Sequence, residues 1–102
     1  MVDSAYLYTP GDRSNYQARM FAPRGGIPED PATGSATALL AGQLLKNGAL
    51  RDGQTTLTLR QGVEMGRPSD LRLTVDVVDG MVQSTRVAGQ AVHVATGQIR
   101  LP

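Results

Sequence analysis

Pro-Glu-Asp-Pro-Ala-Thr-Gly-Ser-Ala-Thr, residues 28–37, runs without a break into Ala-Leu-Leu-Ala-Gly-Gln-Leu-Leu, residues 38–45. The stretch places a carboxylate, a short proline-containing loop and a row of small residues directly before an apolar run. In a helix over residues 31–47, small and apolar residues occupy nearly every side, which is typical of a helix surrounded by protein. The stretch therefore predicts one central, buried helix with a tight loop at its start.

The start of this helix is a candidate anion site. The first turn of a helix leaves backbone N–H groups without partners and carries roughly half a positive charge. Small side chains leave room for a carboxylate or a phosphate to approach those groups. We therefore expect Gly34 and Ser35 to lie at a site for a small anion.

The composition limits the partners and the chemistry that such a site can have. The chain has 102 residues, which predicts one domain over residues 1–102. Ten basic and nine acidic side chains give a net charge of +1, and no basic run marks a surface for nucleic acid. The absence of cysteine excludes disulfides, thiolate metal sites and thiol acid/base catalysis.

No apolar run approaches the roughly 18 residues needed to span a membrane, and the first residues lack the pattern of a signal peptide. We therefore expect no membrane partner and a cytoplasmic location. The glycines form neither a dinucleotide-binding nor a phosphate-binding loop of a known pattern, and no histidine or carboxylate group has metal-ligand spacing. We expect no metal and no cofactor.

Alternating side chains predict strands on both sides of the helix. A turn of Asn47-Gly48 ends the helix, and Asp79-Gly80 joins two strands as a two-residue hairpin. The predicted strands are residues 3–9, 15–23, 56–60, 71–77 and 81–87, followed by short strands at 90–94 and 98–101. The fold class predicted from these elements is α+β, with a curved, largely antiparallel sheet wrapped around one central buried helix.

Four patches of the sequence extend the argument to a family. The first is Glu-Asp-Pro-Ala-Thr-Gly-Ser-Ala at residues 29–36. The others are residues 19–23, residues 61–62 with 65–69, and residues 87–92 with 97–102. Together they resemble, in the same order, the C-terminal lobe of the phenazine-biosynthesis PhzF-like family, a branch of the diaminopimelate-epimerase-like superfamily.

The resemblance implies a fold and a type of chemistry. Members of that family have two similar lobes related by a pseudo-twofold axis, each a curved sheet around a helix, with the active site between them. Their best-known activity is the cofactor-independent isomerisation of a cyclic amino acid bearing a carboxylate. A glutamate of the N-terminal lobe moves the proton, and we expect no counterpart of that lobe in this chain.

The residues that match the family motif receive binding roles from the resemblance. Asp30 would contact polar groups of a small carboxylate-bearing ligand. Ser35 and the backbone around Gly34 and Ala36 would hold the carboxylate, and Thr33 belongs to the same set. Thiol-using relatives carry a cysteine acid/base in this loop, which this chain lacks. Asp30 is therefore the candidate catalytic residue.

Several of these residues also have a purely structural explanation. Asp30 would serve as the helix N-cap, worth about 1 kcal/mol, with Pro31 as the first helical residue. Gly42 would allow the close approach of another segment. An ion pair between Arg19 and Glu29 would explain both residues without a substrate.

Two further residues outside the motif have structural explanations as well. His93 lies on the predicted strand at 90–94, and a surface or half-buried strand position explains it. Arg67 would either approach the cleft and pair with an anion or lie in an exposed turn.

Three functions follow as hypotheses. In the first, two copies form a homodimer that rebuilds the inter-lobe cleft of an isomerase, with Asp30 or Glu29 as the acid/base. In the second, the chain binds a small carboxylate or phosphate without turnover. In the third, the chain needs a separate N-terminal lobe, or is a truncated product without activity, and its uncovered cleft face would be apolar.

Overall fold

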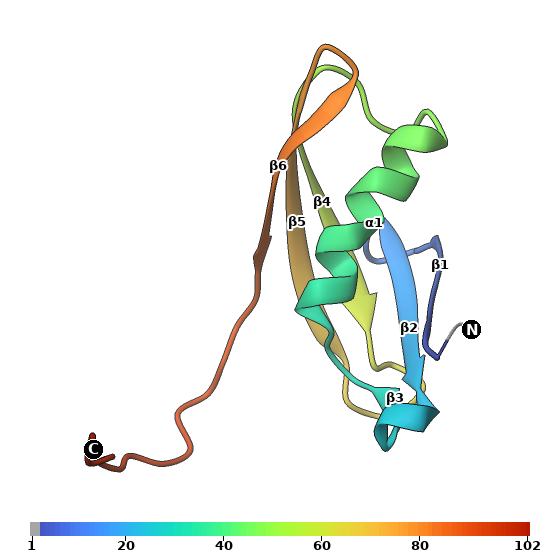
Figure 1. Cartoon of the computed structure of the whole chain (residues 1–102). Helices are drawn as coiled ribbons and strands as arrows, with labels where there is room; N and C mark the ends of the chain where they lie inside the picture. Colours follow the sequence, from blue (N-terminus) through green and yellow to red (C-terminus); the bar gives the residue numbers. More distant parts are fainter. Residues whose placement is uncertain (1–2) are drawn as a thin grey trace.

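The computed structural model describes residues 3–102 and shows one α-helix lying across a six-stranded sheet (Figure 1). The α+β class is confirmed. The elements are β1 (Ala5–Pro10), β2 (Tyr16–Ala22), the 3₁₀ turn η1 (Pro23–Gly25), β3 (Ile27–Asp30), α1 (Gly34–Lys46), β4 (Gly53–Gln61), β5 (Ser69–Val78) and β6 (Met81–Ala88).

The sheet has the strand order β1-β2-β4-β5-β6, with β3 paired to β2 beside this path. All pairs are antiparallel except β2 with β4, which run parallel because α1 forms the connection between them. The predicted hairpin at Asp79-Gly80 is confirmed, with φ angles of 50° and 74° at the two turn residues. The Asp52 carboxylate accepts hydrogen bonds from both turn amides, at 3.1 and 2.9 Å.

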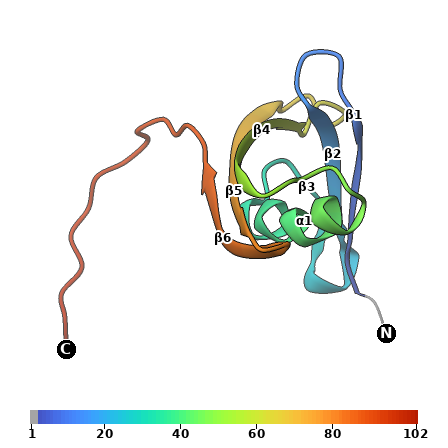
Figure 2. The same cartoon turned by 90° about the horizontal axis from the view of Figure 1, so that it is seen from above.

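The core lies between α1 and the concave face of the sheet, which bends around the helix (Figure 2). Inward residues of β5 alternate with outward ones and are buried on α1, as the sequence pattern predicts. The buried apolar residues are Leu40, Ala41 and Leu44 of α1, with Leu50, Leu59, Leu71, Leu73, Val75 and Val77.

The helix differs from the prediction at its start and in its burial. It begins at Gly34 rather than near residue 31, and it ends as expected at Lys46, followed by Gly48 with φ 75°. Only one side of α1 is covered within residues 3–102, since the side chain of Leu39 is 81% exposed. Gly42 faces open space, so the predicted close approach at this residue is wrong.

The last part of the chain also departs from the prediction. Residues 89–102 leave β6 as an extended, exposed segment that runs away from the sheet (Figures 1 and 2). The predicted strands at 90–94 and 98–101 are therefore not formed. His93 is exposed and lies 2.8 Å, Nε2 to Oγ1, from Thr96. A strand needs a neighbouring backbone to bond to, and this segment has none beside it among the described residues.

Three polar groups surround the carboxylate of Asp76 on β5. It accepts hydrogen bonds from Arg86 at 2.7 Å, from Ser84 at 2.5 Å and from Gln54 at 2.9 Å. These bonds, that of Arg86 first, hold the pKa of Asp76 well below its usual range. The cluster joins β4, β5 and β6 through side chains.

The Asp76 cluster predicts a pH-dependent stability. Because folding lowers the pKa of Asp76, its contribution is fully present above the unfolded value near 3.8 and is lost as the pH falls toward the folded value. Asp76→Asn is therefore expected to destabilise the protein at pH 7 and to match wild type increasingly as the pH drops below about 4. Urea unfolding at pH 7 and below about pH 4 measures the free energy of unfolding of both proteins. An equal loss of stability at pH 7 in Asp12→Asn, at the β1–β2 turn, would contradict the stabilising role of the Asp76 cluster.

Candidate functional site

One buried side chain positions the loop that enters α1. Gln61, the last residue of β4, is 0% exposed. Its Nε2 group donates to the carbonyl oxygen of Asp30 at 2.7 Å and to Oγ1 of Thr33 at 2.9 Å. Its Oε1 accepts from the backbone N–H of Thr33 at 3.2 Å. The amide thus ties both ends of the loop at residues 30–33 to the end of β4.

Asp30 lies at the end of β3, so the predicted N-cap role of this residue is wrong. Its half-buried carboxylate accepts a hydrogen bond from Oγ1 of Thr33 at 2.5 Å. Thr33 occupies the N-cap position, but its side chain is committed to Asp30 and Gln61 and makes no cap hydrogen bond. The first turn of α1 consequently has no side-chain cap.

The backbone at the start of α1 is open to a ligand. The first amide bonded within the helix is that of Thr37, which donates to the carbonyl of Thr33 at 3.2 Å. The amides of Gly34, Ser35 and Ala36 precede it and belong to the orphan donors of a helix start. Gly34 and Ser35 are exposed, and Ala36 is half buried. The uncapped turn presents its partial positive charge to solvent.

Thr37 anchors this turn from within. Its side chain is fully buried, and Oγ1 donates to the carbonyl of Thr33 at 2.7 Å. The hydroxyl of Tyr6 on β1 lies 3.1 Å from Oγ1 of Thr37. Burial raises the pKa of Tyr6, so its hydroxyl stays protonated at neutral pH. The helix start is therefore fixed to β1 as well as to β4.

A glycine allows the turn after β4 to pack against the loop. Gly62 has φ 82°, and a Cβ built there would lie 2.3 Å from the carbonyl oxygen of Arg67 and 2.8 Å from that of Pro31. The amide of Arg67 donates back to the carbonyl of Gly62 at 2.9 Å, which closes the turn. Arg67 itself is exposed in this turn.

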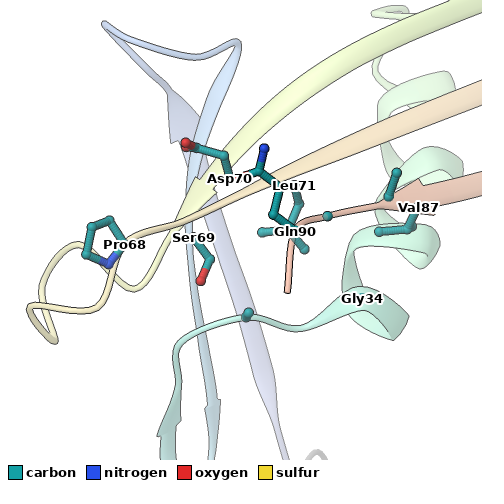
Figure 3. A pocket seen from close by; sticks show the side chains of 10 residues that line it. Gly34, Pro68, Ser69, Asp70, Leu71, Val87 and Gln90 are labelled. Carbon is teal, nitrogen blue, oxygen red and sulfur yellow. The ribbon is translucent and has the colours of Figure 1, made fainter. Parts of the chain in front are cut away.

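Two hollows flank the start of α1. One, of about 400 Å³, is lined by Gly34 together with Ala32, Pro68, Ser69, Asp70, Leu71, Val87, Ala88, Gly89 and Gln90 (Figure 3). The other, of about 440 Å³, lies between β1 and α1 and includes Ser35 and Ala36. The structure thus places Gly34 and Ser35, neighbours in sequence, on different hollows. Asp30 and Thr33 line neither.

The predicted ion pair between Arg19 and Glu29 is confirmed. The guanidinium donates to the two carboxylate oxygens at 2.8 and 3.1 Å. It lies 3.9 Å from the Glu64 carboxylate and 5.0 Å from the ring centre of Phe21. The hydrogen bond from Arg19 lowers the pKa of Glu29, and Glu29 in turn raises the pKa of Arg19. A carboxylate held ionised in this way is a weak base, which leaves Asp30 as the better candidate of the two.

Sequence reasoning missed two residues of this region. They are Gln61, the last residue of β4, and Ser69, the first residue of β5. A polar side chain at the end of a regular strand was the only sequence signal that could have pointed to either residue. Among residues 3–102, no group of three or more histidine, aspartate or glutamate side chains could hold a metal ion. The same part of the chain contains no helix long and apolar enough to cross a bilayer.

Comparisons with known proteins identify the family. Residues 1–97 match the family model described as phenazine biosynthesis-like protein, PhzC-PhzF. The chain belongs to the phenazine biosynthesis-like family. An uncharacterised isomerase of Mesorhizobium japonicum is 43% identical over 99 residues, covering 94% of this chain and 33% of that protein.

Two Pseudomonas members of the phenazine biosynthesis-like family carry a specific name. The trans-2,3-dihydro-3-hydroxyanthranilate isomerase of Pseudomonas chlororaphis is 36% identical, over 97% of this chain and 35% of that enzyme. The enzyme of the same name from Pseudomonas aeruginosa is 35% identical, over 89% of this chain and 32% of that enzyme. The chain therefore spans about a third of the length of the curated relatives it matches.

Proposed function

We propose that this chain binds a small carboxylate-bearing metabolite at the start of α1 and supports cofactor-independent, isomerase-type proton transfer next to that carboxylate. The observation that carries the proposal is the first turn of α1, which has no side-chain cap and whose residues Gly34, Ser35 and Ala36 line two hollows. Orphan amides at a helix start bind carboxylates well. The isomerase names of the relatives support the reaction class.

Asp30 is the proposed acid/base. Its carboxylate precedes the anion-binding turn by one short loop and receives a hydrogen bond from Thr33, whereas Glu29 is bound by Arg19. Asp30 lines neither hollow of the single chain, so its contact with the substrate is proposed to form when the second lobe completes the site. There its carboxylate can accept a proton from carbon and return it to another position. The full site is proposed to require a second lobe, which a second copy of this chain supplies by forming a homodimer.

Ligand binding and proton exchange test the proposal separately. The probes are benzoate, as a plain carboxylate, and trans-2,3-dihydro-3-hydroxyanthranilate, which is named in the relatives. We expect calorimetry to detect both, and NMR in D₂O to show deuterium entering the second probe. Ser35→Ala should weaken binding by about tenfold, because a hydrogen bond to a charged group is lost.

Asp30→Asn should keep binding and lose the deuterium exchange. Ser14→Ala, at the β1–β2 turn, is the matched control and should bind like wild type. If neither probe binds wild-type protein, the anion site is wrong. If both bind and no deuterium enters, the chain is a binding module without turnover and the catalytic part of the proposal is wrong.

A further inference from the structure

The segment after β6 has the pattern of a strand without a partner. Residues 89–102 are exposed along their whole length, and the side chains of Val92 and Val94 are 85% and 86% exposed. Val92 and Val94 are two residues apart and would share one face of a strand, while His93 would lie on the other. From residue 87 to residue 99 the chain carries no acidic or basic side chain apart from His93. Such a segment is suited to enter an apolar environment as a strand.

The opposite edge of the sheet offers a matching place. β1 is the terminal strand, and its outer side pairs with no strand among residues 3–102. Its sequence, Ala-Tyr-Leu-Tyr-Thr-Pro, contains none of the charged residues that usually protect an exposed edge. Six residues of β1 match six residues of the segment at 90–95.

A groove of about 440 Å³ lies beside this edge, on the face toward α1. It is the hollow that Ser35 and Ala36 line at the start of α1. Farther along, its lining includes Tyr6, Tyr8 and the exposed Leu39, and no charged side chain contributes to it. A strand added to β1 would place every second side chain over this groove. Two valine side chains are apolar and would cover the part of the groove along Tyr8 and Leu39, which leaves the part at Ser35 open to the ligand of the proposed function.

The chain's own segment leaves the sheet on the wrong side for this edge. It continues β6, and β6 and β1 are the two ends of the strand order. In both views the segment runs away from β1 (Figures 1 and 2). A second copy can bring its segment to the edge without crossing α1, and a twofold arrangement makes the exchange reciprocal.

We propose that residues 90–95 of one copy add as a strand to the β1 edge of a second copy, with Val92 and Val94 seated in the groove between β1 and α1. The exchange covers the exposed side of α1 and shields the unprotected edge. It specifies the contact in the homodimer of the proposed function. A dimer that persists in Val92→Asp, Val94→Asp and Leu39→Asp would overturn this contact and leave the homodimer of the proposed function standing.

Sedimentation velocity at micromolar concentration tests the exchange. Wild type is expected to be a dimer, and Val92→Asp, Val94→Asp and Leu39→Asp are each expected to raise the dimer Kd by at least about tenfold. All three positions are exposed in the single chain, so folding is not at risk, and circular dichroism verifies this. A monomeric wild type would overturn the proposal.

Matched controls locate the contact. Ile99→Asp changes an equally exposed residue of the same segment outside 90–95, and Met81→Asp changes an exposed residue at the β5–β6 hairpin. Both should leave the Kd within about twofold of wild type. A control that dissociates the dimer as strongly as Val94→Asp would overturn the assigned contact.

Cysteine cross-linking separates exchange between chains from folding back within one chain. The protein has no cysteine, so Leu39→Cys and Val94→Cys introduce the only thiol in each variant, and the mass tag distinguishes the heterodimer from disulfide-linked pairs of one variant. We mix the two single variants, one of them carrying a mass tag, and oxidise the mixture. The expected product is a disulfide-linked heterodimer. If the mixture gives none and the double variant forms the bond within one chain, the exchange is wrong.

Discussion

Gly62→Ala is expected to lower the free energy of unfolding by about 2–5 kcal/mol. A non-glycine residue in the left-handed region costs about 1–2 kcal/mol. The new Cβ would also lie 2.3 Å from the carbonyl oxygen of Arg67 and 2.8 Å from that of Pro31, and both are backbone atoms. Relieving this overlap requires the turn and the loop before α1 to separate, at a further cost of about 1–3 kcal/mol.

Gly66→Ala is the matched control, and urea denaturation is the measurement. Gly66 lies in the same turn with φ 70°, yet a Cβ there meets nothing within 4 Å. Its replacement should therefore show only the backbone cost of about 1–2 kcal/mol. Equal losses in the two variants would show that the contact with Pro31 contributes nothing.

Gln61→Met is expected to destabilise the protein by about 2–4 kcal/mol. Methionine preserves the length of the side chain and removes its amide. The carbonyl of Asp30 and the amide of Thr33 then lose a partner, and an unsatisfied buried polar group costs about 1–3 kcal/mol. Hydrogen exchange at the amide of Thr33 should accelerate well beyond the change in global stability.

Gln17→Met provides the comparison for this variant. Gln17 also donates through its side-chain amide, to Glu64 at 2.9 Å, but that bond is exposed. Its loss should cost less than about 0.5 kcal/mol. If Gln61→Met were as mild as this control, the loop before α1 would be held by something other than the buried amide.

The sequence predicted those elements whose signals are local. Asp79-Gly80 marks a turn by its own conformational preference, and Gly48 ends α1 for the same reason. The strands at β4, β5 and β6 follow from alternation, because each buries one face on α1. The ion pair between Arg19 and Glu29 also followed from residue type.

The features that failed depend on distant partners. Asp30-Pro31 has the composition of a helix start, but Asp30 is the last residue of β3 and is bound by Gln61, 31 residues away in the chain, and the helix begins only at Gly34. β3 was missed because Pro28 and the preceding glycines are typical of a loop. Its pairing comes from β2.

Pairing also limits what the sequence shows at the C-terminal end. Alternation at residues 90–94 indicates that the segment is suited to be a strand, but it does not identify the strand with which it would pair. For the candidate site, the motif predicted a helix start in this region, but it placed that start near residue 31 rather than at Gly34. It did not reveal that Gly34 and Ser35 line different hollows, which depends on where β1 and β6 lie.

The parallel pairing of β2 with β4 through α1 has a consequence for how the protein folds while it is being synthesised. Leu40 and Leu44 of α1 pack on core residues that all come later in the chain, from Leu50 to Val77. A ribosome releases β1, β2 and α1 first, so their apolar faces emerge before the strands that cover them. The core side of α1 is therefore covered only in part, by Tyr6, Tyr8 and Tyr16, until the β4–β5–β6 meander has left the exit tunnel.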